Sequence, residues 1–176
     1  DAETLNQIST GKKENKFGVL EKSFINLVNY CKKSKYLNLK CLSVHIGSQI
    51  LNIKPYQKML SVLEKIIKKT KYHFEYIDLG GGMGIDYKNN NKELDFIKYS
   101  SLIKNFQIKN NSKIIFEPGR SIIGNSGFLI SKIVYIKEGH KKDFIILDAA
   151  MNDLMRPALY KATHRIIPIH KKNNKT

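Results

Sequence analysis

Residues 76–85 read YIDLGGGMGI, and the fold class is best argued outward from this stretch. A short, mainly apolar run of strand length at 76–79 is followed directly by Gly80, Gly81 and Gly82. Because glycines lack a Cβ atom, successive backbone N–H groups can converge there on an anion such as a phosphate. The spacing is neither GxGxxG nor a P-loop, since no Lys-Ser/Thr pair follows. A merely flexible turn is the alternative interpretation.

Two other apolar runs end in the same way. The run at 42–46 leads into Gly47-Ser48-Gln49, and the run at 114–116 leads into Glu117-Pro118-Gly119-Arg120. Polar residues placed just after successive strands are typical of the carboxyl-terminal face of a TIM barrel. A doubly wound sheet would also place its ligands at strand ends, so this pattern alone does not decide between the two folds.

Helical periodicity separates these runs. It predicts helices over 20–35 and 93–106, and a third that begins near Pro55. We expect their apolar stripes to pack in the core; the residues are Phe24, Leu27, Val28, Cys31, Tyr56, Met59, Leu60, Leu63, Ile67, Phe96, Tyr99, Ile103 and Phe106. Strands that alternate with helices indicate βα units and a parallel sheet.

The pattern changes after Arg120. Apolar runs within 127–137 and at 144–147 lie on either side of a Gly139-His140 turn, with no helical periodicity between them. They predict antiparallel strands joined by a basic hairpin. The predicted fold class is therefore α/β: an incomplete TIM-type barrel, its C-terminal portion at 1–125, followed by the start of a β-sandwich or β-barrel domain at 126–176.

Composition narrows the class of protein. The 176 residues carry a formal net charge of +16, which suits nonspecific contact with phosphate backbones. However, the lysines are spread along the whole chain, and a richness in Lys, Asn and Ile is what an AT-biased genome favours.

No apolar stretch approaches the roughly 18 residues of a membrane span. The start has no secretory pattern, and Cys31 and Cys41 give no metal spacing. We expect no nucleic acid, membrane or metal partner, and a cytoplasmic location.

Arginine is rare in this lysine-rich chain. Only Arg120, Arg156 and Arg165 occur, and a guanidinium offers a planar fork for carboxylate or phosphate that an ammonium cannot copy. Arg156 and Tyr160 lie four residues apart with Pro157 after the arginine, a spacing that can present both side chains to one ligand. Chance retention of the arginines on a surface is the alternative.

Three other side chains are candidates for chemistry. His45, at the mouth of a strand, could stack its ring on an aromatic cofactor, with the Ser48 hydroxyl bonding a phosphate; a structural histidine is the alternative. Glu117 could hold a protonated pyridine nitrogen, and Arg120 could bind a substrate carboxylate while neighbouring amides reach the phosphate. An internal Glu–Arg ion pair is the alternative there.

The order and wording of the motifs are more specific than any one of them. HIGSQ (45–49), DLGGGMGID (78–86), FEPGRSI (116–122) and DAAMNDLMRPALY (148–160), together with the opening STGKKENKFG (9–18), resemble the diaminopimelate decarboxylase family from end to end. Ornithine and arginine decarboxylases share the fold and an EPGR-like turn. HIGSQ and the MNDL-RPALY run are more similar to the diaminopimelate branch.

The resemblance implies a fold-type III enzyme that uses pyridoxal 5'-phosphate and acts as a homodimer. It implies decarboxylation of meso-diaminopimelate to L-lysine, the last step of lysine biosynthesis. The implied roles are ring stacking for His45, pairing with the pyridine nitrogen for Glu117, phosphate binding for Ser48, Gly80, Gly81, Gly82 and the amides of Gly119 and Arg120, and substrate binding for Arg120, Arg156 and Tyr160.

The chain also departs from the family pattern. The family's Schiff-base lysine is expected upstream of Asp1, and the loop that reaches into the partner's site is expected beyond Thr176. Ala150 stands where the family usually has glycine. We therefore expect a fragment that is inactive alone. A sister ornithine or arginine decarboxylase, or a noncatalytic remnant or regulatory module of the same fold, are the alternatives.

Overall fold

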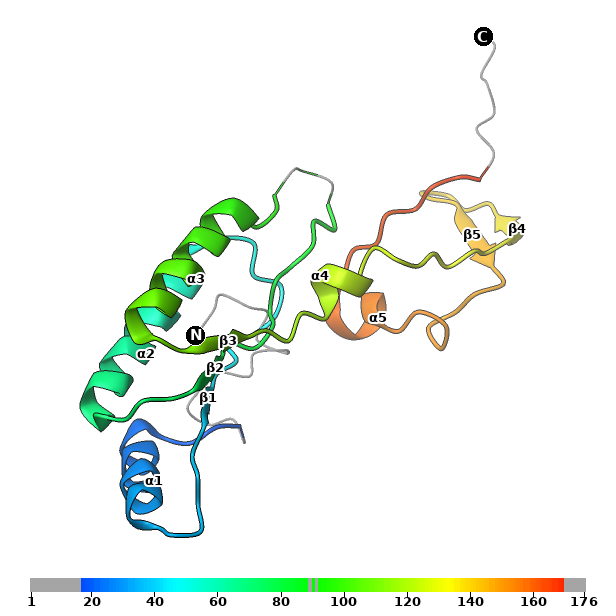
Figure 1. Ribbon diagram of the computed structural model, residues 1–176. Coiled ribbons are helices and arrows are strands. Elements are labelled where there is room, and N and C mark those ends of the chain that lie inside the picture. The colour runs from blue at the N-terminus through cyan, green and yellow to red at the C-terminus, as the bar shows by residue number, and fades with distance from the viewer. Residues whose placement is uncertain (1–16, 89, 91, 170–176) are drawn as a thin grey trace. The chain divides into compact units, whose positions relative to one another are not determined.

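The computed structural model describes residues 17–88, 90 and 92–169 (Figure 1). Residues 9–16 of the opening motif therefore lie outside the described residues. The chain divides into two compact units: Asp1–Asp86 with Asn91–Ser126, and Tyr87–Asn90 with Gly127–Thr176. The enzyme domains predicted at 1–125 and 126–176 stay a prediction.

Unit 1 is built on a parallel sheet. Its strands β1 (Cys41–Ser43), β2 (Tyr76–Asp78) and β3 (Lys113–Ile115) lie in the order β1-β2-β3. Helices link the strands and precede them: α1 (Glu21–Lys33), α2 (Lys54–Thr70) and α3 (Phe96–Asn110). The predicted βα alternation and parallel sheet are thus confirmed, and Figure 1 shows α2 and α3 side by side.

The core lies between this sheet and its helices. Ile77 on β2 is fully buried, as is Tyr56 on α2, whose ring centroid lies 4.7 Å from that of Tyr99 on α3. Both tyrosine hydroxyls are buried without a hydrogen-bond partner. Burial raises the pKa of Tyr99 to about 12 and raises the pKa of Tyr56 as well, so both stay neutral core residues.

The predicted apolar stripe is confirmed on α2, whereas the stripes on α1 and α3 each include one residue that is exposed. Leu27 is 50% exposed and Phe96 is 52% exposed. On α1, Val28 is the buried residue, and the helix is tied to the end of α2 by Lys32 Nζ, which donates to the Thr70 carbonyl (2.5 Å). Such a narrow contact leaves Leu27 outside it. Phe96 is the first residue of α3.

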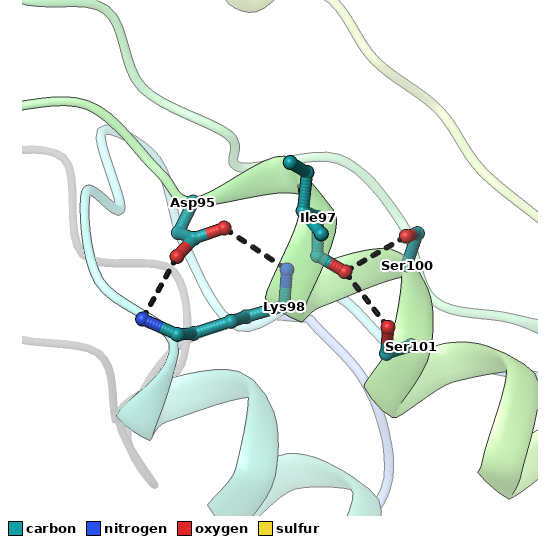
Figure 2. Close-up of polar contacts among 5 residues, drawn as sticks. All are labelled: Asp95, Ile97, Lys98, Ser100 and Ser101. Carbon is teal, nitrogen blue, oxygen red and sulfur yellow. Dashed lines mark hydrogen bonds and ion pairs between the residues drawn. The ribbon is translucent and has the colours of Figure 1, made fainter.

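A side-chain cap sets the start of α3, three residues later than predicted. The carboxylate of Asp95 accepts a hydrogen bond from Lys98 N (3.0 Å) and pairs with Lys98 Nζ (3.0 Å), as Figure 2 shows. One turn on, the Ile97 carbonyl accepts bonds from the hydroxyls of Ser100 (2.9 Å) and Ser101 (3.0 Å). The cap satisfies a backbone donor that a helix start leaves open.

Unit 2 contains the predicted hairpin. Strands β4 (Ile133–Lys137) and β5 (Phe144–Leu147) pair antiparallel, and every residue of both is exposed. A short helix, α5 (Arg156–Tyr160), follows. Within the described part of the chain, no helix is both long enough and apolar enough to cross a membrane.

Candidate functional site

The carboxyl ends of the three parallel strands form one continuous edge in unit 1. Backbone pairing continues beyond the strands, since Leu79 N donates to the Ile115 carbonyl (3.0 Å) and Glu117 N donates to the Gly80 carbonyl (2.9 Å). On the other side, Ile50 N donates to the Gly82 carbonyl (2.9 Å). The predicted motifs after the three strands are therefore neighbours in space, and Gly80, Gly81 and Gly82, the glycine run, lie in the middle.

The glycines of this run are demanded by close backbone packing. A Cβ atom on Gly81 would lie 2.2 Å from the Glu117 carbonyl oxygen, and one on Gly82 would lie 2.3 Å from that of Gly47. A Cβ atom on Gly80 would lie 2.6 Å from the Val44 carbonyl oxygen. The run is therefore packed against both neighbouring segments rather than forming a loose turn, and phosphate binding by it stays a prediction.

His45 is held against the glycine run. The Gly81 N–H donates to His45 Nδ1 at 3.4 Å, so a neutral imidazole carries its hydrogen on Nε2. The side chain is exposed, which leaves ring surface available to a ligand. Ser48 is half-buried in the same loop.

Arg120 is fixed by Gln49, a residue whose role the motif analysis missed. Arg120 opens the short helix α4 (Arg120–Ile123), and its Nη1 donates to Gln49 Oε1 (3.0 Å). The Gln49 side-chain amide also donates to the Ile85 carbonyl (2.5 Å) and accepts from Ile85 N (3.3 Å). The signal was present, because Gln49 ends the HIGSQ motif, but its two partners are distant in sequence.

Glu117 and Gly119 complete this edge. The Glu117 side chain is exposed, while its backbone packs on Gly81. A Cβ atom on Gly119 would meet no atom within 4 Å, so space adjoins its backbone. The donor set is thus an exposed imidazole, an exposed carboxylate, a braced arginine and glycine-rich backbone. This chemistry fits a flat heteroaromatic cofactor that carries an anionic group. Among the described residues, no group of three or more His, Cys, Asp or Glu could hold a metal ion.

The remaining predicted residues, Arg156 and Tyr160, belong to unit 2. The Arg156 guanidinium carbon lies over the Tyr160 ring at 5.9 Å from its centroid, and over the Tyr87 ring at 5.8 Å. The His164 ring meets the Tyr87 ring edge-on, with centroids 5.7 Å apart and an interplanar angle of 85°. Neither Tyr87 nor His164 belongs to one of the motifs identified in the sequence, so both were missed at that stage.

The third arginine lies close by in the same unit. Arg165 lines a cavity of about 360 Å³ together with Tyr87, Lys88 and Thr163. Tyr87 thus borders both Arg156 and a cationic cavity.

Comparisons with known proteins agree with this geometry. Residues 1–124 match the family model described as pyridoxal-dependent decarboxylase, pyridoxal binding domain. Diaminopimelate decarboxylase of Aquifex aeolicus is 41% identical over 179 aligned residues, which is 99% of this chain and 42% of the relative. The same-named protein of Zymomonas mobilis is 41% identical, over 94% of this chain and 40% of the relative.

The structural comparison gives the same family. The crystal structure of diaminopimelate decarboxylase from Helicobacter pylori complexed with L-lysine matches with a TM-score of 0.89 at 39% sequence identity. The match covers 98% of this chain and 44% of that one, so the chain spans less than half the length of the relatives it matches. The expected TIM-type α/β fold class is confirmed.

Proposed function

The chain belongs to the pyridoxal-dependent decarboxylase family, and we propose that it forms part of a diaminopimelate decarboxylase. The reaction would release CO₂ from meso-diaminopimelate and leave L-lysine. The observation that carries the proposal is the edge of unit 1, where His45, the glycine run, Glu117 and Arg120 come together within the span matched by the pyridoxal binding model.

In this proposal the edge of unit 1 holds pyridoxal 5'-phosphate. When bound, the cofactor supplies an electron sink for the charge left by the departing CO₂. His45 stacks on the ring, in an orientation supported by its bond from Gly81. Glu117 keeps a proton on the pyridine nitrogen, which strengthens the sink. Ser48, the glycine run and the amides of Gly119 and Arg120 bind the phosphate.

Substrate carboxylates are assigned to the arginines. Arg120 is braced by Gln49 and therefore loses little side-chain freedom when it binds a planar carboxylate. Arg156 and Tyr160, which contact each other on α5, are also assigned to a substrate carboxylate, as the family resemblance implies. The lysine that anchors the cofactor is expected outside this chain, upstream of Asp1. A homodimer and a cytoplasmic location belong to the same proposal, as they follow from the family resemblance.

The test uses the protein made from the complete gene. Pyridoxal phosphate absorbance is recorded first, and then CO₂ release from meso-diaminopimelate, ornithine and arginine. We expect turnover of meso-diaminopimelate alone. Glu117→Gln should lower kcat by roughly a hundredfold or more, because an amide cannot hold the ring proton. Glu93→Gln, at another exposed carboxylate, is the matched control and should leave kcat unchanged.

Each other outcome has a defined meaning. Bound cofactor with CO₂ released from ornithine or arginine instead would identify a sister decarboxylase. A protein that binds no cofactor would be a noncatalytic relative. An unchanged kcat in Glu117→Gln would show that Glu117 does not pair with the pyridine nitrogen.

A further inference from the structure

Arg156 has an unusual environment for an arginine. Its guanidinium lies over two aromatic rings, those of Tyr87 and Tyr160, at 5.8 and 5.9 Å from their centroids. Its Nε is buried and has no hydrogen-bond partner. Across the described part of the chain, no carboxylate forms an ion pair with Arg156.

The two ring contacts involve the flat faces of the guanidinium and leave the N–H groups in its plane for a ligand. Aromatic rings attract the cation through their faces and offer no acceptor in the guanidinium plane. A buried N–H without an acceptor is costly, so a site that leaves one open is suited to an acceptor supplied by a ligand. The planar N–H edge matches a carboxylate, which can accept two parallel bonds.

Tyr87 is itself held in place. It follows the glycine run in the sequence, whereas the other members of the cluster come from 156–164. His164 meets its ring edge-on, and His164 Nε2 is also buried without a hydrogen-bond partner. A ring fixed in this way can restrict a long, flexible arginine to one orientation, which lowers the entropy lost on binding.

We propose that Tyr87 is a positioning residue that orients Arg156 to receive the carboxylate of the amino-acid substrate, through the face of its ring. The proposal rests on the proposed function and adds to it a residue that no motif carries. The ring, and not the phenol hydroxyl, is the part that acts. Tyr87→Phe should therefore preserve binding, whereas Tyr87→Leu should weaken it.

The experiment measures ligand affinity on the cofactor-loaded protein from the complete gene, by calorimetry. L-lysine and cadaverine are the two probes, because they differ only in the carboxylate. In Tyr87→Leu we expect the Kd of L-lysine to rise by roughly three- to thirtyfold, the range of a ring–cation contact, with the Kd of cadaverine unchanged. Tyr87→Phe should restore the L-lysine affinity, and Tyr36→Leu, at a tyrosine that is 96% exposed, is the matched control.

The readouts separate the two proposals. If the unaltered protein binds neither cofactor nor L-lysine, the proposed function fails. If it binds L-lysine and Tyr87→Leu changes nothing, or weakens both probes equally, the role of Tyr87 is overturned. If Tyr87→Phe is as weak as Tyr87→Leu, the hydroxyl acts and the ring-face mechanism is wrong.

Discussion

The two units of the chain bury their apolar side chains very differently. Every one of the 16 buried hydrophobic residues of the described chain belongs to unit 1. In unit 2, both strands are exposed along their whole length, with Phe128 and Ile166 exposed at 86% and 93%. A βα unit covers its own sheet with its own helix, whereas a two-stranded ribbon has nothing of its own to cover either face.

In unit 2, hydrogen bonds to aspartate side chains hold the hairpin together instead. The Asp148 carboxylate accepts bonds from the Ser131 hydroxyl and the Lys132 amide, both at 2.8 Å, and so joins the two ends of the hairpin. Asp143 accepts from the Gly139 amide across the turn (3.2 Å). We therefore expect substitutions in unit 1 to change the free energy of unfolding through packing, and substitutions in unit 2 to change it through hydrogen bonding.

The largest effect should come from the core of unit 1. Ile77→Ala removes a fully buried side chain from the central strand and should lower the free energy of unfolding by about 2–5 kcal/mol. Ile146→Ala, on β5 at 44% exposure, should cost less than about 1 kcal/mol. Urea unfolding of the complete gene product measures both. An equal loss of unfolding free energy in the two variants would show that other residues of the complete gene product cover β5. The difference in burial between units 1 and 2 would then not hold in the complete protein.

A smaller loss of stability is expected when a glycine of the 80–82 run is replaced. Gly81→Ala places a methyl group against the Glu117 carbonyl and should cost about 1–3 kcal/mol, because backbone must move. Gly127→Ala in unit 2 is the matched control, since its Cβ atom would meet nothing within 4 Å. Unfolding midpoints of both variants give the comparison. A Gly81→Ala protein as stable as the control would contradict the close packing of the run.

The smallest effect is a dependence on pH in unit 2. The Lys132 amide and then the Ser131 hydroxyl lower the pKa of Asp148 below its usual value. The folded pKa thus lies below the unfolded one, so this stabilisation is complete above about pH 4 to 5 and is lost as pH falls through the folded pKa. Asp148→Asn should lower the unfolding temperature slightly at neutral pH, and the difference from the unaltered protein should vanish in acid. A difference that persists in acid would exclude the carboxylate charge as its cause.

Much of unit 1 was predictable from sequence because its signals are local. Helical periodicity located α2 within a few residues, and strand-length runs located all three parallel strands. The start of α3 was predicted at residue 93 but lies at Phe96, because the Asp95 side chain caps the helix there. Helices α4 and α5 were missed, since four or five residues are too few for a period to be visible.

The site was predictable only as far as its motifs reach. His45, Glu117 and Arg120 each follow a strand, so parallel-sheet geometry alone brings them to one edge. Gln49 escaped because its bonds to Ile85 and Arg120 link residues 36 and 71 positions away. Tyr87 escaped for the same reason, as its contact with Arg156 depends on tertiary structure that one sequence does not display.

The glycine run also has a consequence for how this gene can change. Any change in the first or second base of a glycine codon introduces a side chain or stops the chain. At Gly80, Gly81 and Gly82 the first atom of any new side chain would come within 2.2–2.6 Å of a backbone oxygen. Neutral drift at these codons is therefore confined to the third base, whatever the base composition of the gene.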